Sequence, residues 1–452
     1  MIKRKIGILL SSFVAVGALV SLTGCKKKYD LVIYSWEDYI YEGTDDDGNP
    51  IDDDGGVIDR FVAYYKEKHG KTLKVDYETF STNEDMYQQL SLGAIKPDVI
   101  CPSDYMIQKM ANEGLLEKFS YDEVSHKYGE SLQNFENYGS PFIKGRFENE
   151  KLSDGNSFLS YAVPYFWGTM GFTYNPEFFD EEEVNTWECL WTKGEITEEF
   201  PNGKNFKQFS LKDSMRDTYV TAIFHVFKNE IAALDETAAD YNAQLSAIFN
   251  DCRDTTIDKV KTALIDAKKN LGTVYGLEVD EGKNDIVTGK YNANLAWSGD
   301  AIYAMDSAED ADKTLNYALP KEGSNVWFDG WCMPKGARKD VAEEFVNFMC
   351  DPEIAVLCMD EVGYTSPIVG DAMWEYVQET YAAKEGVTDT YEVDLSFYFG
   401  KEAKINIPTS EKGRQFDAQY PTEEALKRCC IMKDFGDQQE KVDKMWSEFK
   451  AA

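Results

Sequence analysis

Residues 31–39 read LVIYSWEDY, and residues 97–105 read PDVICPSDY. In both stretches a short apolar run, typical of a buried strand, stops at an aromatic ring beside a carboxylate. Residues 56–69 and 105–113 show the spacing of apolar side chains that is typical of a helix. This order of strand, helix, strand and helix favours an α/β fold, with a sheet between layers of helices.

Aromatic rings stand beside carboxylates in four segments: Trp36-Glu37-Asp38-Tyr39, Ser103-Asp104-Tyr105, Trp297-Ser298-Gly299-Asp300 and Trp327-Phe328-Asp329. A ring face attracts a cation through its quadrupole, and a carboxylate attracts it by charge. One such pair alone is more often a packed ring and a solvated acid. Because four pairs occur in distant parts of one chain, we expect a cleft for a small, elongated cation with several charges.

The same alternation of strands and helices continues to the C-terminus. Further strands are predicted over 72–80, 98–101, 294–297, 317–320 and 326–334, and further helices over 83–92, 213–226, 231–248, 301–305, 340–360 and 438–449. Two stretches, 45–56 and 383–419, are interpreted as insertions. The first spaces its acids as a calcium loop does, but Pro50 stands where such a loop needs glycine, which predicts a solvated loop without metal.

Composition restricts the class of partner. The 452 residues carry a formal net charge of -34, and 43% are hydrophobic. Such a chain is globular, and it is long enough for two lobes. The negative charge opposes binding to nucleic acid, whose phosphates need Lys and Arg. It suits cationic ligands, although it also keeps an exported protein soluble.

The N-terminus is typical of an export signal. Lys3-Arg4-Lys5 is basic, residues 6–20 are apolar but short for a membrane span, and Leu22-Thr23-Gly24-Cys25 follows. This tetrad resembles the lipobox of bacterial lipoproteins. The resemblance implies cleavage before Cys25, lipidation of its thiol and a protein anchored outside the cytoplasm. An even number of cysteines after Cys25 allows disulfides, but several lie in apolar runs, which favours mostly free thiols.

No enzyme motif is found. With three histidines the chain has no His-Glu-x-x-His, and it has no Gly-x-Ser-x-Gly and no phosphate-binding loop. We therefore predict a protein without catalytic residues, cofactor or metal. An extracellular hydrolase stays open as an alternative, because a chain so rich in acids could hide a carboxylate pair.

Seven segments in order resemble the solute-binding proteins of bacterial spermidine/putrescine (polyamine) ABC transporters: 33–39, 97–105, 164–168, 213–217, 297–300, 327–329 and 363–367. The family implies a two-lobed fold of the periplasmic binding protein type II, with a ligand cleft between lobes joined by crossing hinge strands. We expect a lipoprotein signal peptide over 1–25, a first lobe over 29–164 and 330–372, and a second lobe over 165–329 and 373–452.

The resemblance also implies residue roles. In the first lobe, Trp36 and Tyr39 would offer ring faces with Asp38 nearby, and Ser103 and Tyr105 would line the cleft. Asp217 would meet an ammonium group of the ligand, and Asp329 would pair with an amine. Trp297 and Trp327 would flank the methylene chain, and Tyr364 would close the rim of the pocket. Asp300 joins this ligand-binding set as the acid that accompanies Trp297.

Two departures leave the ligand open. Ser214 stands where many members of the family carry a second acid, and Met432 stands roughly where some carry an amide. Spermidine, putrescine and other diamine-like cations all stay possible, and a sugar is the main rival because it also stacks on Trp and bonds to Asp. The expected protein is a monomer that delivers its ligand to an ABC permease.

Overall fold

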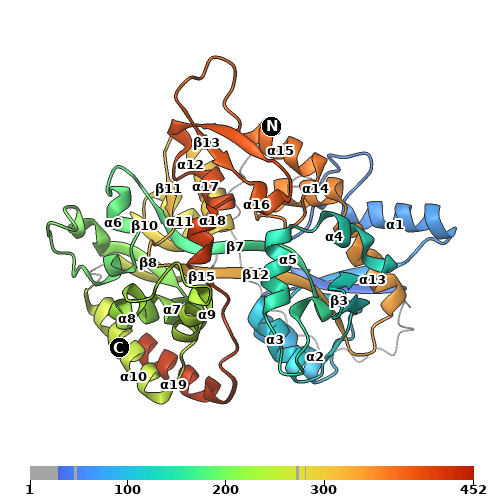
Figure 1. Ribbon diagram of the computed structural model, residues 1–452, viewed down its shortest axis with the longest axis horizontal. Coiled ribbons are helices and arrows are strands. Elements are labelled where there is room, and N and C mark those ends of the chain that lie inside the picture. The colour runs from blue at the N-terminus through green and yellow to red at the C-terminus, as the bar shows by residue number, and fades with distance from the viewer. Residues whose placement is uncertain (1–28, 45–47, 271–273, 280) are drawn as a thin grey trace.

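The computed structural model describes residues 29–44, 48–270, 274–279 and 281–452. Helices gather in two groups, at the left and right of Figure 1, and two long strands run from one group to the other. These strands are β7 (Ala162–Tyr174) and β12 (Ser324–Pro334), and both are buried along their whole length. The predicted signal peptide, 1–25, lies outside the described residues.

One large sheet runs through both lobes. Its strands follow the order β2-β1-β3-β12-β7-β10-β8-β9. Antiparallel pairing of β7 with β12 joins the halves, and the register shifts between Asp329 and Gly330. Irregularities of this kind turn side chains out of the regular pattern of a strand and are frequent beside binding sites.

The first lobe comes mainly from the N-terminal part of the chain. Its elements are β1 (Leu31–Trp36), α1 (Val57–His69), β2 (Val75–Phe80), α2 (Asn83–Ser91), β3 (Val99–Ile100), α3 (Asp104–Asn112), β4 (Leu116–Glu117), β5 (Tyr121–Asp122), β6 (Lys127–Tyr128), α4 (Gln133–Tyr138) and α5 (Pro141–Asn149), followed after β12 by α13 (Lys339–Met349) and α14 (Pro352–Val362).

The second lobe lies between the crossing strands in sequence, with the last helix added. Its elements are α6 (Glu181–Val184), β8 (Gln208–Lys212), α7 (Met215–Val226), α8 (Lys228–Ala232), α9 (Tyr241–Phe249), α10 (Asp254–Asn270), β9 (Val274–Glu278), α11 (Gly282–Thr288), β10 (Ala293–Trp297), α12 (Ser298–Asp310), β11 (Asn316–Ala318) and α19 (Gln439–Ala451).

The remaining elements, apart from the last strand, lie above the crossing strands in Figure 1, whereas the last strand, Cys429–Cys430, pairs with β12. They are α15 (Asp371–Tyr381), β13 (Thr390–Asp394), α16 (Ser396–Phe399), β14 (Lys404–Pro408), α17 (Gln415–Gln419), α18 (Glu423–Lys427) and β15 (Cys429–Cys430). Helix α15 packs on α14 and α16 on α5, whereas α17 packs on α12 and β11. The predicted insertion 383–419 therefore contacts both lobes.

The buried side chains favour a later end of the first lobe than the sequence did. Met373, Leu395, Tyr398 and Leu426 belong to the same core cluster as Leu31. Cys429 and Ile431 still belong to that cluster, whereas Cys430, Met432 and the buried residues of α19 join the clusters of the second lobe. The predicted boundaries, 29–164 and 330–372 for the first lobe and 165–329 and 373–452 for the second, stay predictions. This packing argues for ending the first lobe near residue 429 instead of at 372.

Two predicted helices are broken in the structure. The helix expected over 231–248 is interrupted between α8 and α9. The one expected over 340–360 ends at Met349, and α14 starts anew at Pro352, with the Asp351 side chain capping the Glu353 N–H at 3.0 Å. Proline has no N–H to continue a helix, so it suits the first turn of a new one.

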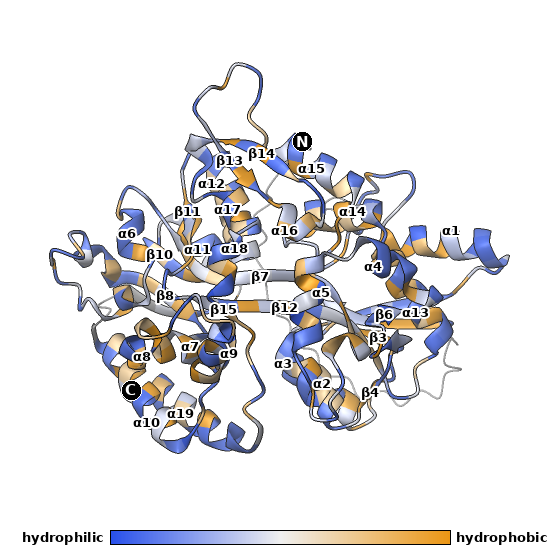
Figure 2. Ribbon diagram, viewed as in Figure 1, coloured by the Kyte–Doolittle hydropathy of each residue, from blue (hydrophilic) through white to orange (hydrophobic). Residues whose placement is uncertain are grey.

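Hydrophobic and hydrophilic residues mix along the outer helices. Figure 2 shows both colours on α1 and on α13, for example. In α1 the buried residues are Val57 and Phe61, one turn apart, which is the pattern of a helix that covers a sheet with one face. Within the described ranges, none of the helices has the length and apolar character needed to cross a bilayer.

Candidate ligand-binding site

Asp329 lies where β12 crosses between the lobes. Its side chain accepts a hydrogen bond from the Tyr39 hydroxyl at Oδ2, and its backbone pairs with Ser103. The residue is 6% exposed, and Oδ1 has no hydrogen-bond partner among the described residues. Burial raises the pKa of Asp329 to about 6, although the nearby Tyr39 and Ser103 hydroxyls oppose this shift. A buried carboxylate oxygen without a partner is suited to receive a donor from a ligand.

Aromatic rings pack around Tyr39, the residue that donates a hydrogen bond to this carboxylate. The ring of Tyr39 packs edge-on against Phe166 and Tyr364, with centroids 5.2 and 5.8 Å away. Tyr364 in turn packs edge-on against Trp327 at 5.1 Å. The structure thus brings together Tyr39, Trp327, Asp329 and Tyr364, as predicted, and adds Phe166 of β7.

Ser103 and Tyr105 are held together by a residue that the sequence analysis did not select. Asn83, the first residue of α2, donates its amide hydrogens to Ser103 Oγ at 3.1 Å and to the Tyr105 hydroxyl at 3.0 Å. Its side-chain oxygen accepts the Ser103 N–H at 3.2 Å. Nothing local distinguishes Asn83 in the sequence, because all its partners lie about 20 residues away.

On the second lobe, β8 and β10 run parallel, so their last residues, Lys212 and Trp297, lie at the same edge of the sheet. Asp300 follows in the first turn of α12. It accepts hydrogen bonds from Lys212 at 2.7 Å and from the Tyr364 hydroxyl at 3.0 Å. Burial alone would raise the pKa of Asp300, but the charges of Lys212 and Lys283 and the hydrogen bonds from Lys212 and Tyr364 outweigh burial and lower it.

Asp217 lies in the first turn of α7 and is also buried. Trp297 donates its ring N–H to Asp217 Oδ1 at 3.3 Å, and Ser214 caps the helix by accepting the Asp217 N–H. Burial raises the pKa of Asp217, and the hydrogen bonds from Ser214 and Trp297 and the nearby charges of Lys212 and Arg216 oppose this. Ser214, one of the two departures from the family pattern, therefore acts as a helix cap.

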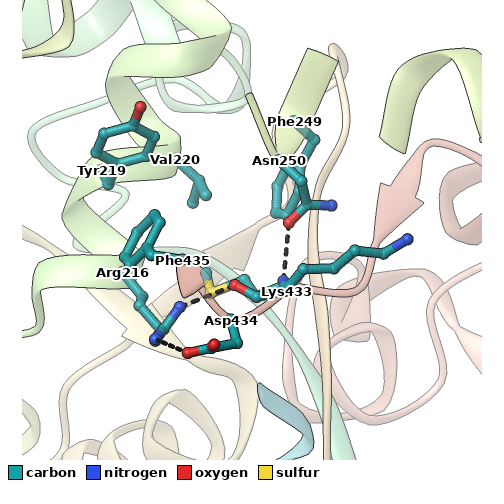
Figure 3. A pocket seen from close by; sticks show the side chains of 9 residues that line it. Arg216, Tyr219, Val220, Phe249, Asn250, Lys433, Asp434 and Phe435 are labelled. Atoms are coloured by element: carbon teal, nitrogen blue, oxygen red, sulfur yellow. Dashed lines mark hydrogen bonds and ion pairs between the residues drawn. The ribbon is translucent and has the colours of Figure 1, made fainter. Parts of the chain in front are cut away.

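Arg216, beside Asp217, reaches across to the first lobe. Its guanidinium lies 4.1 Å from the centroid of the Tyr105 ring and 4.4 Å from that of Phe435. It also donates to the Lys433 carbonyl at 2.8 Å and pairs with Asp434. Figure 3 shows Arg216 beside Lys433, Asp434 and Phe435 at a small pocket, which Met432 also lines. The ring of Tyr105, which was predicted to line the ligand site, is thus covered by the Arg216 guanidinium.

Two predicted residues lie apart from this network. Trp36 packs against Phe80, with ring centroids 4.6 Å apart. Asp38 is exposed and has a left-handed backbone, with φ of 51°. Across the described part of the chain, no hydrogen bond or ring contact joins either residue to Asp329, so their roles in binding stay predictions.

The three buried acids of the site differ in whether a cation of the protein forms an ion pair with them. Among the residues that the structure describes, Asp300 has an ion-pair partner, Lys212, whereas no salt bridge reaches Asp217 or Asp329. Buried carboxylates without a cation are costly unless a ligand brings one. The arrangement is therefore suited to an elongated molecule with a positive charge toward each of these two acids and a methylene chain among the rings.

Within the described ranges there is no cluster of three or more His, Cys, Asp and Glu side chains that could hold a metal ion. The eight cysteines from Cys101 to Cys430 are free thiols in the structure, and seven of them are buried.

Comparison with known proteins identifies the family. Residues 60–378 match the sequence family described as bacterial extracellular solute-binding protein. The chain belongs to this family. The description of the family agrees with the predicted role of a solute-binding protein outside the cytoplasm.

Individual relatives are more specific. The chain is 25% identical over 360 residues to the spermidine/putrescine-binding periplasmic protein of Salmonella typhimurium, covering 78% of this chain and 82% of the relative. This confirms the resemblance to polyamine-binding proteins that the seven segments indicated.

Solved structures confirm the fold. The chain is similar to the spermidine/putrescine ABC transporter substrate-binding protein PotD of Streptococcus pneumoniae, with a TM-score of 0.60, 24% identity and coverage of 93% of this chain and 98% of that one. It is also similar to the Tp0655 (TpPotD) lipoprotein of Treponema pallidum, with a TM-score of 0.58, 19% identity and the same coverage. The predicted two-lobed type II fold is correct.

Proposed function

We propose that this solute-binding protein captures a polyamine, such as putrescine or spermidine, between its lobes and delivers it to the permease of an ABC importer. One observation carries the proposal. Asp329 is a buried carboxylate among aromatic rings, it lacks an ion-pair partner among the described residues, and it keeps Oδ1 without a hydrogen-bond partner. An alkylammonium group supplies both the charge and the donor that this oxygen lacks.

The second acid supports a ligand with more than one charge. Asp217 lies in the second lobe, across from Asp329. It is buried and accepts a hydrogen bond from the Trp297 ring N–H. A ligand that bridges Asp329 and Asp217 would hold the lobes together, and the rings of Trp297, Trp327 and Tyr364 would pack along its methylene groups. The relative from Salmonella and the structural neighbour from Streptococcus are both named for spermidine and putrescine, which supports the same ligands here.

Attachment to the membrane is part of the proposal. The tetrad Leu22-Thr23-Gly24-Cys25 supports a lipid on Cys25 at the outer face of the cell membrane, and the neighbour from Treponema is itself named a lipoprotein. The basic residues Lys26, Lys27 and Lys28 would add attraction to anionic headgroups. We further propose that the protein acts as a monomer.

Isothermal titration calorimetry on the purified, extensively dialysed full-length protein tests the ligand class. Putrescine, spermidine and maltose are each titrated into the protein, and quenching of Trp fluorescence gives an independent signal. We expect a dissociation constant in the micromolar range or below for at least one amine and no binding of maltose. If maltose binds in the micromolar range and neither amine does, the cation site is wrong and a sugar site replaces it.

A further inference from the structure

Lys212 places a positive charge inside the proposed site. Its side chain is 2% exposed, and Nζ lies 3.8 Å from the centroid of the Trp297 ring. Nζ also donates to Asp300 Oδ2 at 2.7 Å and to the Val279 carbonyl at 2.8 Å. An ammonium group has three hydrogens. The Asp300 carboxylate, the Val279 carbonyl and the Trp297 ring face together satisfy all three, so the Lys212 ammonium is held in place by the folded protein itself.

The contacts of Lys212 are those expected of a ligand amine. Trp297 and Asp300 form one of the four ring-and-acid pairs that predict a cation site from the sequence. In the structure a side chain of the protein itself takes the position between that ring and that acid. Both oxygens of Asp300 are used, Oδ2 by Lys212 and Oδ1 by the Tyr364 hydroxyl. In contrast, Asp329 Oδ1 has no partner in the described part of the chain.

We infer that Lys212 is a specificity-determining residue, which fills the Trp297–Asp300 position and leaves the site with acids for two ligand ammonium groups instead of three. This inference rests on the proposed polyamine function. Asp329 and Asp217 are the acids that remain, because both oxygens of the buried Asp104 accept backbone N–H groups, those of Tyr105 and Phe328. The ligand class is therefore a diamine, and a third ammonium on a longer amine gains no buried carboxylate.

The position of Lys212 in the fold explains why it can act this way. It is the last residue of β8, which runs parallel to β10, and Trp297 is the last residue of β10. Asp300 follows in the first turn of α12, where an acid is also favoured by the helix dipole. The ring, the acid and the lysine are thus held by neighbouring elements of one lobe, and they keep their places whichever ligand enters.

The test compares putrescine, with two ammonium groups, and spermidine, with three, by calorimetry on the full-length protein and two variants. In the parent, spermidine should bind no more than about threefold tighter than putrescine. Lys212→Met removes the charge and nearly keeps the shape, which exposes Asp300 to the ligand. We expect the affinity ratio to shift toward spermidine by tenfold or more. An unchanged ratio in a Lys212→Met protein with a cooperative melting curve would overturn the inference.

Lys212→Met leaves Asp300 buried without a cation, which destabilises the fold. A second variant keeps the test decisive if Lys212→Met does not fold. Lys212→Met with Asp300→Asn removes both charges together. Because the pair then presents no acid to the ligand, this double variant should show no shift toward spermidine relative to the parent. A tenfold shift toward spermidine in the double variant would mean that the shift does not come from an uncovered Asp300, and would overturn the inference. Failure of the parent to bind either amine contradicts the proposed function instead.

Discussion

Tyr39 donates its hydroxyl hydrogen to Asp329 Oδ2, although 290 residues separate the two in the chain. This hydrogen bond joins the loop after β1 to the crossing strand β12. It orients the carboxylate so that one oxygen is used by the protein and the other, Oδ1, has no partner within the described residues. The electrostatic part of the proposed function depends on this arrangement.

Replacing Asp329 by Asn should weaken polyamine binding by two orders of magnitude or more. Removing one partner of a buried ion pair commonly costs about 3–5 kcal/mol, because the other charge stays uncompensated, and about 1.4 kcal/mol is a factor of ten. Calorimetry with putrescine and spermidine measures the change. The matched control, Trp327→Phe, should weaken binding much less, since a ring face remains and the cation–π contribution is about 0.5–2 kcal/mol. Affinity of Asp329→Asn within threefold of the parent would remove Asp329 from the site.

Binding should weaken in acid. Burial holds the pKa of Asp329 at about 6, so the carboxylate that attracts the ligand is protonated below that pH. The ligand amines keep their charge, because alkylammonium groups resemble Lys with a pKa near about 10.4. Affinity should be nearly constant from pH 8 to 7 and should fall by about tenfold per pH unit below 6. Calorimetry across this range gives the profile, and the step near pH 6 should be missing in Asp329→Asn.

Without ligand, the same substitution should stabilise the protein. The folded pKa of Asp329 lies above its usual 3.8, so folding favours the protonated form. This stability is complete below about pH 4 and is lost as the pH rises through 6. At pH 8 the buried charge therefore lowers the free energy of unfolding by about 3 kcal/mol. Dialysed Asp329→Asn should melt at a higher temperature than the parent at pH 8, and the difference should vanish near pH 4. A lower melting temperature at pH 8 would contradict the raised pKa.

Gly299→Ala should disturb the contact between the lobes. A Cβ at Gly299 would lie 1.3 Å from Tyr364 Cδ1, so the ring must move. Its hydrogen bond to Asp300 and its contact with Trp327 would then be lost. Overpacking of this kind costs about 1–3 kcal/mol. We expect polyamine affinity to fall by tenfold or more.

A glycine in open space provides the matched control for Gly299→Ala. A Cβ added at Gly145, inside α5, would meet no atom within 4 Å apart from its chain neighbours and the backbone of its own helix. Gly145→Ala should keep the affinity and raise the stability by about 0.5–1 kcal/mol. Equal effects of the two substitutions on affinity would mean that the Tyr364 ring does not depend on Gly299.

Cys25→Ser should release the protein from the membrane. The lipobox-like tetrad predicts that the Cys25 thiol carries the lipid, and serine has no thiol to modify. Fractionation of cells that express each form, with detection of the protein in membrane and soluble fractions, measures the change. Retention of the variant in the membrane fraction would point to an uncleaved apolar segment as the anchor.

The sequence by itself determined the fold class and most of the site's components. Alternation of apolar strands and amphipathic helices is a local pattern, so β1, α1 and β3 could be predicted from neighbouring residues. The ring-and-acid segments are local in the same sense. Local pattern failed at Pro352, where an apolar periodicity continues although the helix is broken.

Only the tertiary structure decided which acids are left for a ligand. Lys212 and Asp300 are 88 residues apart, and their ion pair forms because β8 and β10 end at the same edge of the sheet. Asn83 also donates a hydrogen bond to Ser103, and Arg216 lies over the Tyr105 ring, because tertiary packing brings these distant residues together. A sequence pattern shows that a carboxylate stands beside a ring. Whether a cation of the protein already neutralises that carboxylate depends on how distant strands pack, because charges interact through space and not along the chain.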